Sequence, residues 1–416
     1  MTASFDRVTD SIDVCPLDSF PKARAADRPL DPDPRYAALH ETGSLPKVSC
    51  PAGIDAYLIT DYEQIRATLG NPHLSSRASS SFHAQPGHDF AAPINTGNII
   101  QLDGEAHLRI RKLLISEFTV KRMQALTPYV QRIIDERIDA MLAKAPGPVD
   151  LVSEFALPIP SLVICELLGV PYEERDQFQD HSAAVVDTDV PVADKDHPIA
   201  ALVGYMTGLV TRKLADPTED DLLGRLILRA AETGAGLTTH ELVDLGLILL
   251  LAGHETTANM IGLATVALLE HPDQLDRLRG DPSLAEPAVE EMLRYLTIVQ
   301  FGLLRYATED IDVAGQTVKA GEWLIGALSA GNRDPRVYPD PDAVDVGRKA
   351  ANHLAFGFGV HQCLGQQLAR VELRAVFRTL YRRIPTLRLA VPADELPFKH
   401  SAIVYGLKSL PITWDS

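Results

Sequence analysis

A long run without proline, from Thr239 to Glu270, constrains the fold of this chain more than any other stretch. Thr238 and Glu241 stand at the spacing of a helical capping box, and the next proline is Pro272. At ~1.5 Å per residue such a helix would be on the order of 48 Å long. Residues 245–252 are apolar nearly all round, a pattern typical of a buried helix. We therefore expect a helix that crosses the centre of a large fold.

Helical patterns dominate the rest of the chain, and strand patterns are a minority. We expect further helices after Asp31, through residues 65–69, over 105–143 with a break near Thr127 and Pro128, and over 158–168, 216–236, 285–295 and beyond Cys363. Strands are expected at 56–60, 311–313, 317–318, 323–327 and near the C-terminus, and irregular segments at 74–98 and 181–200. The fold class is mainly α with minor β. We expect a polar N-terminal arm at 1–30 and one domain at 31–416.

Composition and charge narrow the possible partners. The chain has 416 residues, is 46% hydrophobic and carries a formal net charge of −17, which argues against a nucleic-acid or anionic-membrane partner. Its four cysteines form no CxxC pair and suggest no disulfide framework, so a cytoplasmic location is expected. No signal peptide is recognised, and the longest apolar stretches are expected to be too short to span a bilayer.

One cysteine, Cys363, stands between glycines just before a helical pattern. A thiolate at a helix N-terminus is favoured by the positive end of the helix dipole, and turn amides could point at its sulfur. Such a site could hold a metal through one soft, anionic ligand. The alternative for a lone cysteine is a buried structural thiol in a turn. A zinc site shared by His361 and Cys363 is a further alternative, but no other ligands cluster nearby.

The cysteine loop resembles the heme-binding loop of the cytochrome P450 family, F-x-x-G-x-x-x-C-x-G. Phe356, Gly359, Cys363 and Gly365 all match this pattern. The resemblance implies a P450 fold, with a long central helix over a buried heme b and a small β-rich subdomain. It also implies that the Cys363 thiolate is the proximal ligand of the heme iron.

Polar residues interrupt the apolar central helix at Ala252-Gly-His-Glu-Thr-Thr257. Burying such side chains is costly unless they are paired or used, and a solvent-facing polar turn is the alternative. The stretch is similar to the oxygen-activation motif of P450 enzymes, A/G-G-x-D/E-T-T. That similarity implies that Thr256 hydrogen-bonds dioxygen and that Glu255 links it to bulk protons.

Two further groups of residues match family positions. Glu291 and Arg294 form an ExxR pair, which the family keeps as a buried structural pair, with Arg348 as our candidate third member. For an isolated ExxR, the alternative is an ordinary surface ion pair. Four side chains are expected to bind the heme propionates: His107, Arg111, Arg305 and His361.

The expected substrate pocket is apolar, which favours a bulky, weakly polar substrate. By the family's layout it is lined by Ile248, Leu251, Ala252, Val299, Phe301, Ile403 and Val404. The segments 74–98 and 181–200 would form its roof. The C-terminal residues 396–411 resemble those of an actinomycete subgroup that hydroxylates macrolides, other natural products and xenobiotics.

The resemblance also implies partners. No flavin or nicotinamide fingerprint and no Fe–S cysteine cluster is present, so electrons are expected from a ferredoxin and an NAD(P)H-dependent ferredoxin reductase. Basic residues expected near the docking face are Lys112, Lys121, Arg122 and Arg370. The chain is expected to act as a monomer and as an O2-dependent monooxygenase. Two alternatives remain on the same fold: a heme-thiolate binding or sensor protein, and a peroxide-driven peroxygenase.

Overall fold

The computed structural model describes residue 24 and residues 27–43, 45–50, 54–77, 98–144, 147–175, 196–400 and 402–415. The expected arm at 1–30 and roof segments at 74–98 and 181–200 lie largely outside these ranges. Two residues within the expected arm, Arg24 and Leu30, are buried. Arg24 donates hydrogen bonds to the carbonyl oxygens of Leu296 (2.7 Å) and Thr297 (3.2 Å), so the end of this segment packs onto the fold.

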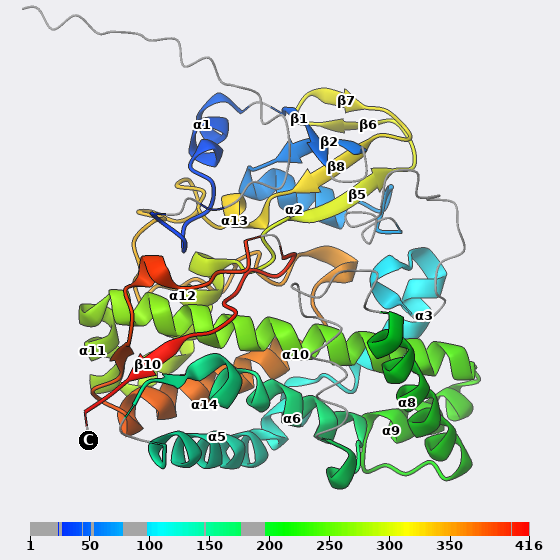
Figure 1. The fold of residues 1–416 in the computed structure, drawn as a ribbon. Helices are drawn as coiled ribbons and strands as arrows, with labels where there is room; N and C mark the ends of the chain where they lie inside the picture. Colours follow the sequence, from blue (N-terminus) through cyan, green and yellow to red (C-terminus); the bar gives the residue numbers. More distant parts are fainter. Residues whose placement is uncertain are drawn as a thin grey trace, which may run out of the picture.

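The central helix α10 spans Thr239–Glu270, the bounds expected from sequence, and both hydrogen bonds of its capping box are present. Helices pack around it on several sides (Figure 1). They are α6 (Pro158–Leu168), α8 (Asp196–Ala215), α11 (Pro272–Gly280), α12 (Ala285–Leu296) and α14 (Gln366–Arg383). Around these lie α3 (Gly104–Ile115), α4 (Val120–Ala125), α5 (Thr127–Leu142), the π-helical turn η4 (Val152–Ala156) and α9 (Leu222–Thr233).

A β-rich part lies above the helices in the view of Figure 1. Its five-stranded sheet has the order β1 (Lys47–Cys50), β2 (Ile54–Ile59), β8 (Trp323–Gly326), β5 (Leu303–Ala307) and β3 (Leu74–Ser75). Only β2 and β8 pair in parallel within this sheet. With it lie α1 (Arg35–Thr42), α2 (Tyr62–Gly70), α13 (Leu328–Gly331) and the hairpin of β6 (Ile311–Val313) and β7 (Gln316–Val318). A separate small sheet joins β4 (Val149–Asp150), β10 (Pro411–Thr413) and β9 (Arg388–Leu389).

The architecture is therefore mainly α with minor β, as the sequence predicted, with several local differences. The region 105–143 breaks twice, because α3 ends at Ile115 before the break that precedes Thr127. Residues 196–200, expected to be irregular, begin α8. Strand β5 was not foreseen, because its apolar residues show no clean alternation.

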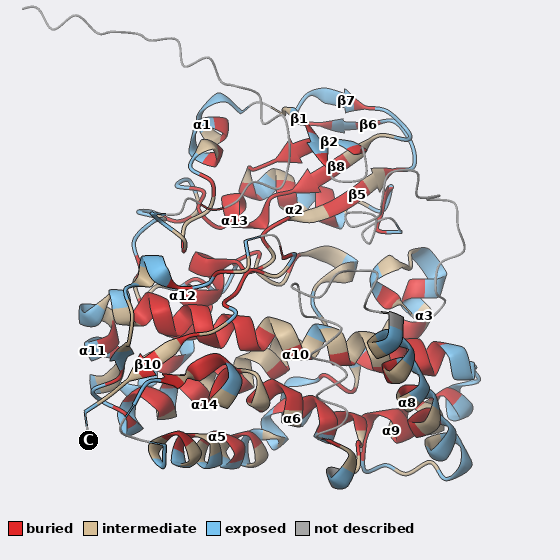
Figure 2. Ribbon diagram, viewed as in Figure 1, coloured by how far each residue is buried: buried red, intermediate tan, exposed pale blue. Residues whose placement is uncertain are grey.

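The central helix is most deeply buried in its second half, not in its first. Every residue from Thr257 to Leu268 is buried, whereas Ile248 and Leu251 are half-buried and Ala252 is exposed (Figure 2). By length and composition, α10 could cross a membrane, contrary to the expectation that the apolar stretches are too short; of its most apolar window, 56% is buried in the fold. The core helix of a globular protein meets the same criterion.

Candidate active site

The loop before α14 presents Cys363 under tight backbone constraints. Its amide donates to the carbonyl oxygen of Phe356 (2.8 Å), which closes the loop. Gly359 has φ +75°, and a Cβ there would lie 2.5 Å from the carbonyl oxygen of Leu69. Glycine is therefore required, because a side chain would both strain the backbone and strike α2.

The side chain of Cys363 has an exposed surface. It nevertheless lies deep among surrounding protein atoms, and this burial raises the pKa of the thiol. Hydrogen bonds from the backbone N–H groups of Gly365 and Gln366 and the charges of Arg111 and Arg370 lower this pKa. Since Gln366 is the first residue of α14, the thiol lies at the helix N-terminus that the sequence predicted.

A cluster of cationic and imidazole side chains lies beside this loop. The rings of His107 and His361 are 4.2 Å apart between centroids, and Arg111 donates to the carbonyl oxygen of Gln362 (2.6 Å). His107 is buried, and burial lowers its pKa to about 4, aided by the charges of His361 and Arg111. The Nε2 atom of His107 has no hydrogen-bond partner among the described residues. Helix α3 and the cysteine loop thus bring three of the four expected propionate ligands together.

Asp103, just before α3, organises this cluster and was given no role by the sequence reasoning. Its carboxylate lies 3.6 Å from Nε2 of His361 and accepts hydrogen bonds from Ser75 and Ser76. Burial opposes ionisation, but the hydrogen bonds from His361, Ser75 and Ser76 hold the pKa of Asp103 below its usual range. Ser76 also lies 2.9 Å from Nε2 of His361.

Arg305, on β5, is the fourth expected propionate ligand. Its side chain is 4% exposed, and burial lowers its pKa to about 10, a shift that the charge of Asp103 opposes. Its guanidinium donates a hydrogen bond to the carbonyl oxygen of Leu304 (2.8 Å), and this side chain forms no ion pair within the described ranges. A buried guanidinium without a carboxylate is costly, so this position favours an anionic ligand.

The polar residues near the middle of α10 have different partners and environments. The hydroxyl of Thr256 donates to the carbonyl oxygen of Ala252 one turn earlier (2.6 Å). His254 is buried, and burial, together with the charge of Lys399, lowers its pKa to about 4. Glu255 accepts a hydrogen bond from Lys399 (3.2 Å). Lys399 was missed, because no local pattern marks a partner so distant in sequence.

The ExxR pair is fully buried. Arg294 donates to both carboxylate oxygens of Glu291 (2.8 and 2.9 Å), and Arg348 donates to Glu291 Oε1 (3.1 Å). Arg294 also donates to the carbonyl oxygens of Asn332 and Pro341. The expected triad is thus present in the geometry, and it ties α12 to the segment 332–348.

The expected pocket residues do not all share one environment. Ile248, Leu251, Val299 and Val404 are half-buried, and Val299 pairs with Val404 in an isolated β-bridge. Ala252 and Ile403 are exposed. Phe301 is 4% exposed and packs in the hydrophobic cluster of β1, β2 and β8, and its place in the pocket stays a prediction.

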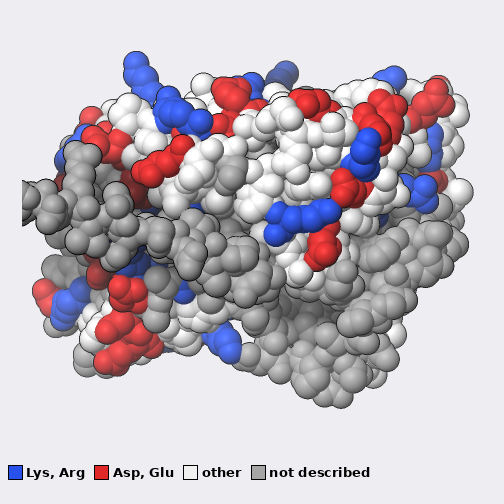
Figure 3. Space-filling model, turned by 90° about the horizontal axis from the view of Figure 1, so that it is seen from above, with Lys and Arg blue, Asp and Glu red and all other residues white. Residues whose placement is uncertain are grey.

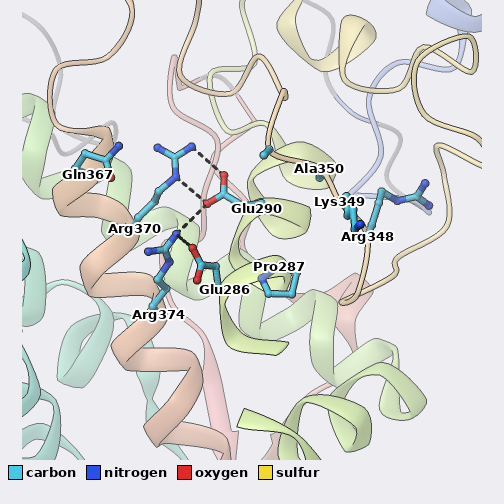
Figure 4. A pocket seen from close by; sticks show the side chains of 10 residues that line it. Glu286, Pro287, Glu290, Arg348, Lys349, Ala350, Gln367, Arg370 and Arg374 are labelled. Atoms are coloured by element: carbon cyan, nitrogen blue, oxygen red, sulfur yellow. Dashed lines mark hydrogen bonds and ion pairs between the residues drawn. The ribbon is translucent and has the colours of Figure 1, made fainter. Parts of the chain in front are cut away.

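The expected docking cations also divide. Lys112 and Lys121 are exposed, and Arg122 lies 3.6 Å from the buried Glu117. Arg370 is not a free cation, because it donates two hydrogen bonds to Glu290 (2.7 and 2.9 Å; Figure 4). These two residues line a pocket of about 460 Å³ between α12, residues 348–351 and α14.

Comparison with known proteins gives a consistent identification. The cytochrome P450 family profile matches residues 282–385. The chain is 43% identical to cytochrome P450-SU2 of Streptomyces griseolus (95% of this chain, 97% of the relative) and 43% identical to the vitamin D3 dihydroxylase of the same species (99% of each). The crystal structure of CYP105P1 in complex with filipin I superposes with a TM-score of 0.87, at 43% identity, over 95% of this chain and 98% of that one. The chain belongs to the cytochrome P450 family of heme-thiolate monooxygenases.

Proposed function

We propose that this P450 hydroxylates a bulky, weakly polar natural product or xenobiotic, using electrons from a ferredoxin. Substrate, dioxygen, two electrons and two protons give the hydroxylated product and water. The likeness to the vitamin D3 dihydroxylase and to the filipin I complex carries this proposal, because both names specify a large, mostly apolar ligand. The half-buried Ile248, Leu251 and Val404 support it.

The residues beside the cysteine loop fit a heme. Among the described residues, Nε2 of His107 has no hydrogen-bond partner and the buried Arg305 has no ion pair, so both can take up the two anionic propionates, together with Arg111 and His361. Cys363 provides a thiol whose sulfur accepts hydrogen bonds from the backbone N–H groups of Gly365 and Gln366. Within the described part of the chain, no group of three or more His, Cys, Asp or Glu is arranged to hold a metal in another way.

When bound, heme supplies the redox chemistry of dioxygen activation, which a cysteine thiolate ligand favours. Cys363 would hold the iron, and the N–H groups of Gly365 and Gln366 would disperse the charge of its sulfur. Thr256 would present its hydroxyl to dioxygen after releasing the carbonyl oxygen of Ala252. Glu255 would take protons from solvent and pass them to that hydroxyl.

The electron donor is proposed from charge. Lys112 and Lys121 are exposed, and a ferredoxin is expected to be acidic, so these two lysines would contact it electrostatically. Lys112→Glu should slow reduction of the enzyme by the ferredoxin at low ionic strength, whereas Lys319→Glu, in the distant β6–β7 region, should not.

The location is proposed from the cysteines. The buried thiols Cys50 and Cys165 are free, which fits the reducing conditions of the cytoplasm. We expect a monomer.

Two residues of α10 distinguish the monooxygenase from the two alternative functions on the same fold. A binding or sensor protein has no use for an acid beside the hydroxyl of Thr256, and a peroxide-driven enzyme needs no protons relayed for O–O cleavage of dioxygen. The presence of Glu255 and Thr256 at adjacent positions therefore favours the monooxygenase.

One spectrum and one turnover assay test the proposal. The reduced holoenzyme with CO should absorb at the wavelength diagnostic of thiolate-bound heme, and Cys363→Ser should lose that signal. Product should require both dioxygen and an electron donor, and formation with peroxide alone would contradict the proposal. Thr256→Ala should reduce product per electron by roughly tenfold or more and release hydrogen peroxide. A screen of macrolides, polyenes and drug-like compounds that follows the heme spin state would identify the substrate.

A further inference from the structure

A lysine from the C-terminal part of the chain reaches the middle of the central helix. The Nζ atom of Lys399 lies 3.2 Å from Oε1 of Glu255 and 3.4 Å from Oδ1 of Asn259. The side chains of Lys399 and Glu255 are each 14% exposed, so the pair is shielded from solvent more than a surface ion pair. Such a contact is stronger than a fully exposed ion pair, because screening by water and salt is reduced.

The contacts hold one carboxylate oxygen and leave the other available. Oε1 of Glu255 accepts from Lys399 and from Nδ2 of Asn259, one turn later on α10 (3.4 Å). Oε2 accepts no hydrogen bond from any residue in the described ranges. Lys399 and Asn259 therefore fix the orientation of the carboxylate, and Oε2 is the oxygen that can carry a proton.

The segment that bears Lys399 is itself fixed against α10. Lys399 donates its amide to the carbonyl oxygen of Gly406 (2.9 Å), and a Cβ on Gly406 would lie 2.1 Å from Oδ1 of Asn259. Farther along the same segment, the carbonyl oxygen of Ile403 accepts a hydrogen bond from the backbone N–H group of Gln300 (3.2 Å). Lys399 is thus placed by backbone contacts rather than by its own flexible side chain.

Among the residues that the structure describes, Lys399 is the one cation that forms an ion pair with Glu255. His254 is its neighbour on α10, but burial and the charge of Lys399 lower the pKa of His254 to about 4, so this imidazole is neutral near pH 7. His400 follows Lys399 but faces the rings of Phe398 and Tyr405, each 6.0 Å away between centroids. The positive charge beside the carboxylate therefore belongs to Lys399.

We infer that Lys399 is a positioning residue for proton delivery: it holds the Glu255 carboxylate in one orientation and so leaves Oε2 free to carry the proton. The inference rests on the proposed proton relay through Glu255 and Thr256. A carboxylate that is held in one orientation presents the same oxygen to the Thr256 hydroxyl in every turnover.

The experiment compares coupled turnover of Lys399→Met holoenzyme with that of wild type at neutral pH. Product per electron at neutral pH should drop by about tenfold as peroxide is released, because the carboxylate is no longer oriented. Lys399→Arg should restore the wild-type coupling, and Lys319→Met is the matched control, since Lys319 forms an exposed ion pair with Asp310 (2.8 Å) away from α10.

A readout independent of turnover is a double-mutant cycle in urea unfolding of the holoenzyme. Lys399→Met and Glu255→Gln should be non-additive, as expected for side chains in direct contact. If Lys399→Met fails to retain heme, Lys399→Gln provides the same loss of charge with a hydrogen-bond donor in place.

The two proposals fail in different ways. If Glu255→Gln keeps wild-type coupling, the relay itself is wrong. If Glu255→Gln uncouples turnover while Lys399→Met keeps the wild-type coupling, the relay stands and the role of Lys399 is overturned. Additive unfolding free energies would also overturn it.

Discussion

Arg294 shows how a single buried charge is stabilised in this protein. Its guanidinium is fully buried and makes hydrogen bonds to Glu291 and to backbone carbonyl groups from two segments. Removing one member of a buried pair leaves the other charge without compensation, which costs far more than the pair contributes. The role of this triad therefore lies in folding.

We predict that Glu291→Ala lowers the free energy of unfolding by about 3–5 kcal/mol, because Arg294 then stays buried without its carboxylate. Urea unfolding of the holoenzyme measures this loss. Glu286→Ala, on the same helix, is the control: its side chain is 59% exposed and pairs with Arg374, so its loss should stay under about 1 kcal/mol. Equal losses in the two variants would contradict the prediction.

At the scale of elements, α10 and the C-terminal segment 396–407 approach each other unusually closely. Gly406 leaves no room for a side chain beside Asn259. Gly406→Ala should therefore destabilise the fold by roughly 1–3 kcal/mol through overpacking. The comparison is Gly280→Ala in α11, where a Cβ would meet nothing within 4 Å. A thermal denaturation series in which both variants behave alike would rule out the close approach.

The start of α10 depends on its capping box. The hydroxyl of Thr238 accepts from the amide of Glu241 (3.1 Å), and the Glu241 carboxylate accepts from the amide of Thr238 (2.9 Å). Thr238→Ala should cost about 1 kcal/mol of stability in urea unfolding. Thr239→Ala, one residue later and exposed, should change little. A loss no larger than that of Thr239→Ala would show that the cap does not stabilise the helix.

At the scale of the whole molecule, the described part of the face in Figure 3 shows charge that is spread rather than concentrated. Acidic and basic side chains are interspersed over the described part of the face in Figure 3. The net charge of −17 thus gives no large patch of one sign on that face. Three buried side chains have shifted pKa values that make the stability of the fold depend on pH: His254, Glu290 and Glu372.

Acid should destabilise the protein through His254. Burial, with the charge of Lys399, lowers its pKa from 6.5 to about 4, so the unfolded chain binds the proton more tightly than the folded one. The contribution is complete above pH 6.5 and is lost as pH falls toward 4, by roughly 3 kcal/mol in all. Glu290, whose pKa is about 2 because hydrogen bonds from His353 and Arg370 outweigh its burial, adds a loss below pH 4.5.

The measurement is unfolding free energy against pH for wild type and His254→Gln. The variant should lose less stability between pH 6.5 and 4, because its side chain does not titrate. Glu372 acts in the opposite sense, since burial raises its pKa well above the usual range, and the comparison of two proteins cancels its effect. Identical slopes would mean that folding leaves the pKa of His254 unchanged.

The sequence alone determined the features that depend on neighbouring residues. The bounds of α10, its cap and the bounds of α6 follow from local patterning, and the cysteine loop follows from glycines that a tight turn requires. The Glu291–Arg294 contact follows from helical spacing. These predictions needed no knowledge of which distant segments meet.

Only the tertiary structure decided which distant residues lie together. Lys399 and Glu255 are 144 positions apart, and Arg370 and Glu290 are 80 apart, so no periodicity signals either pair. For the same reason the sequence placed Arg370 near the docking face without showing that Glu290 binds it. An ion pair or a buried ring is a property of the packed chain, because desolvation and contact arise only when segments far apart in sequence exclude water together.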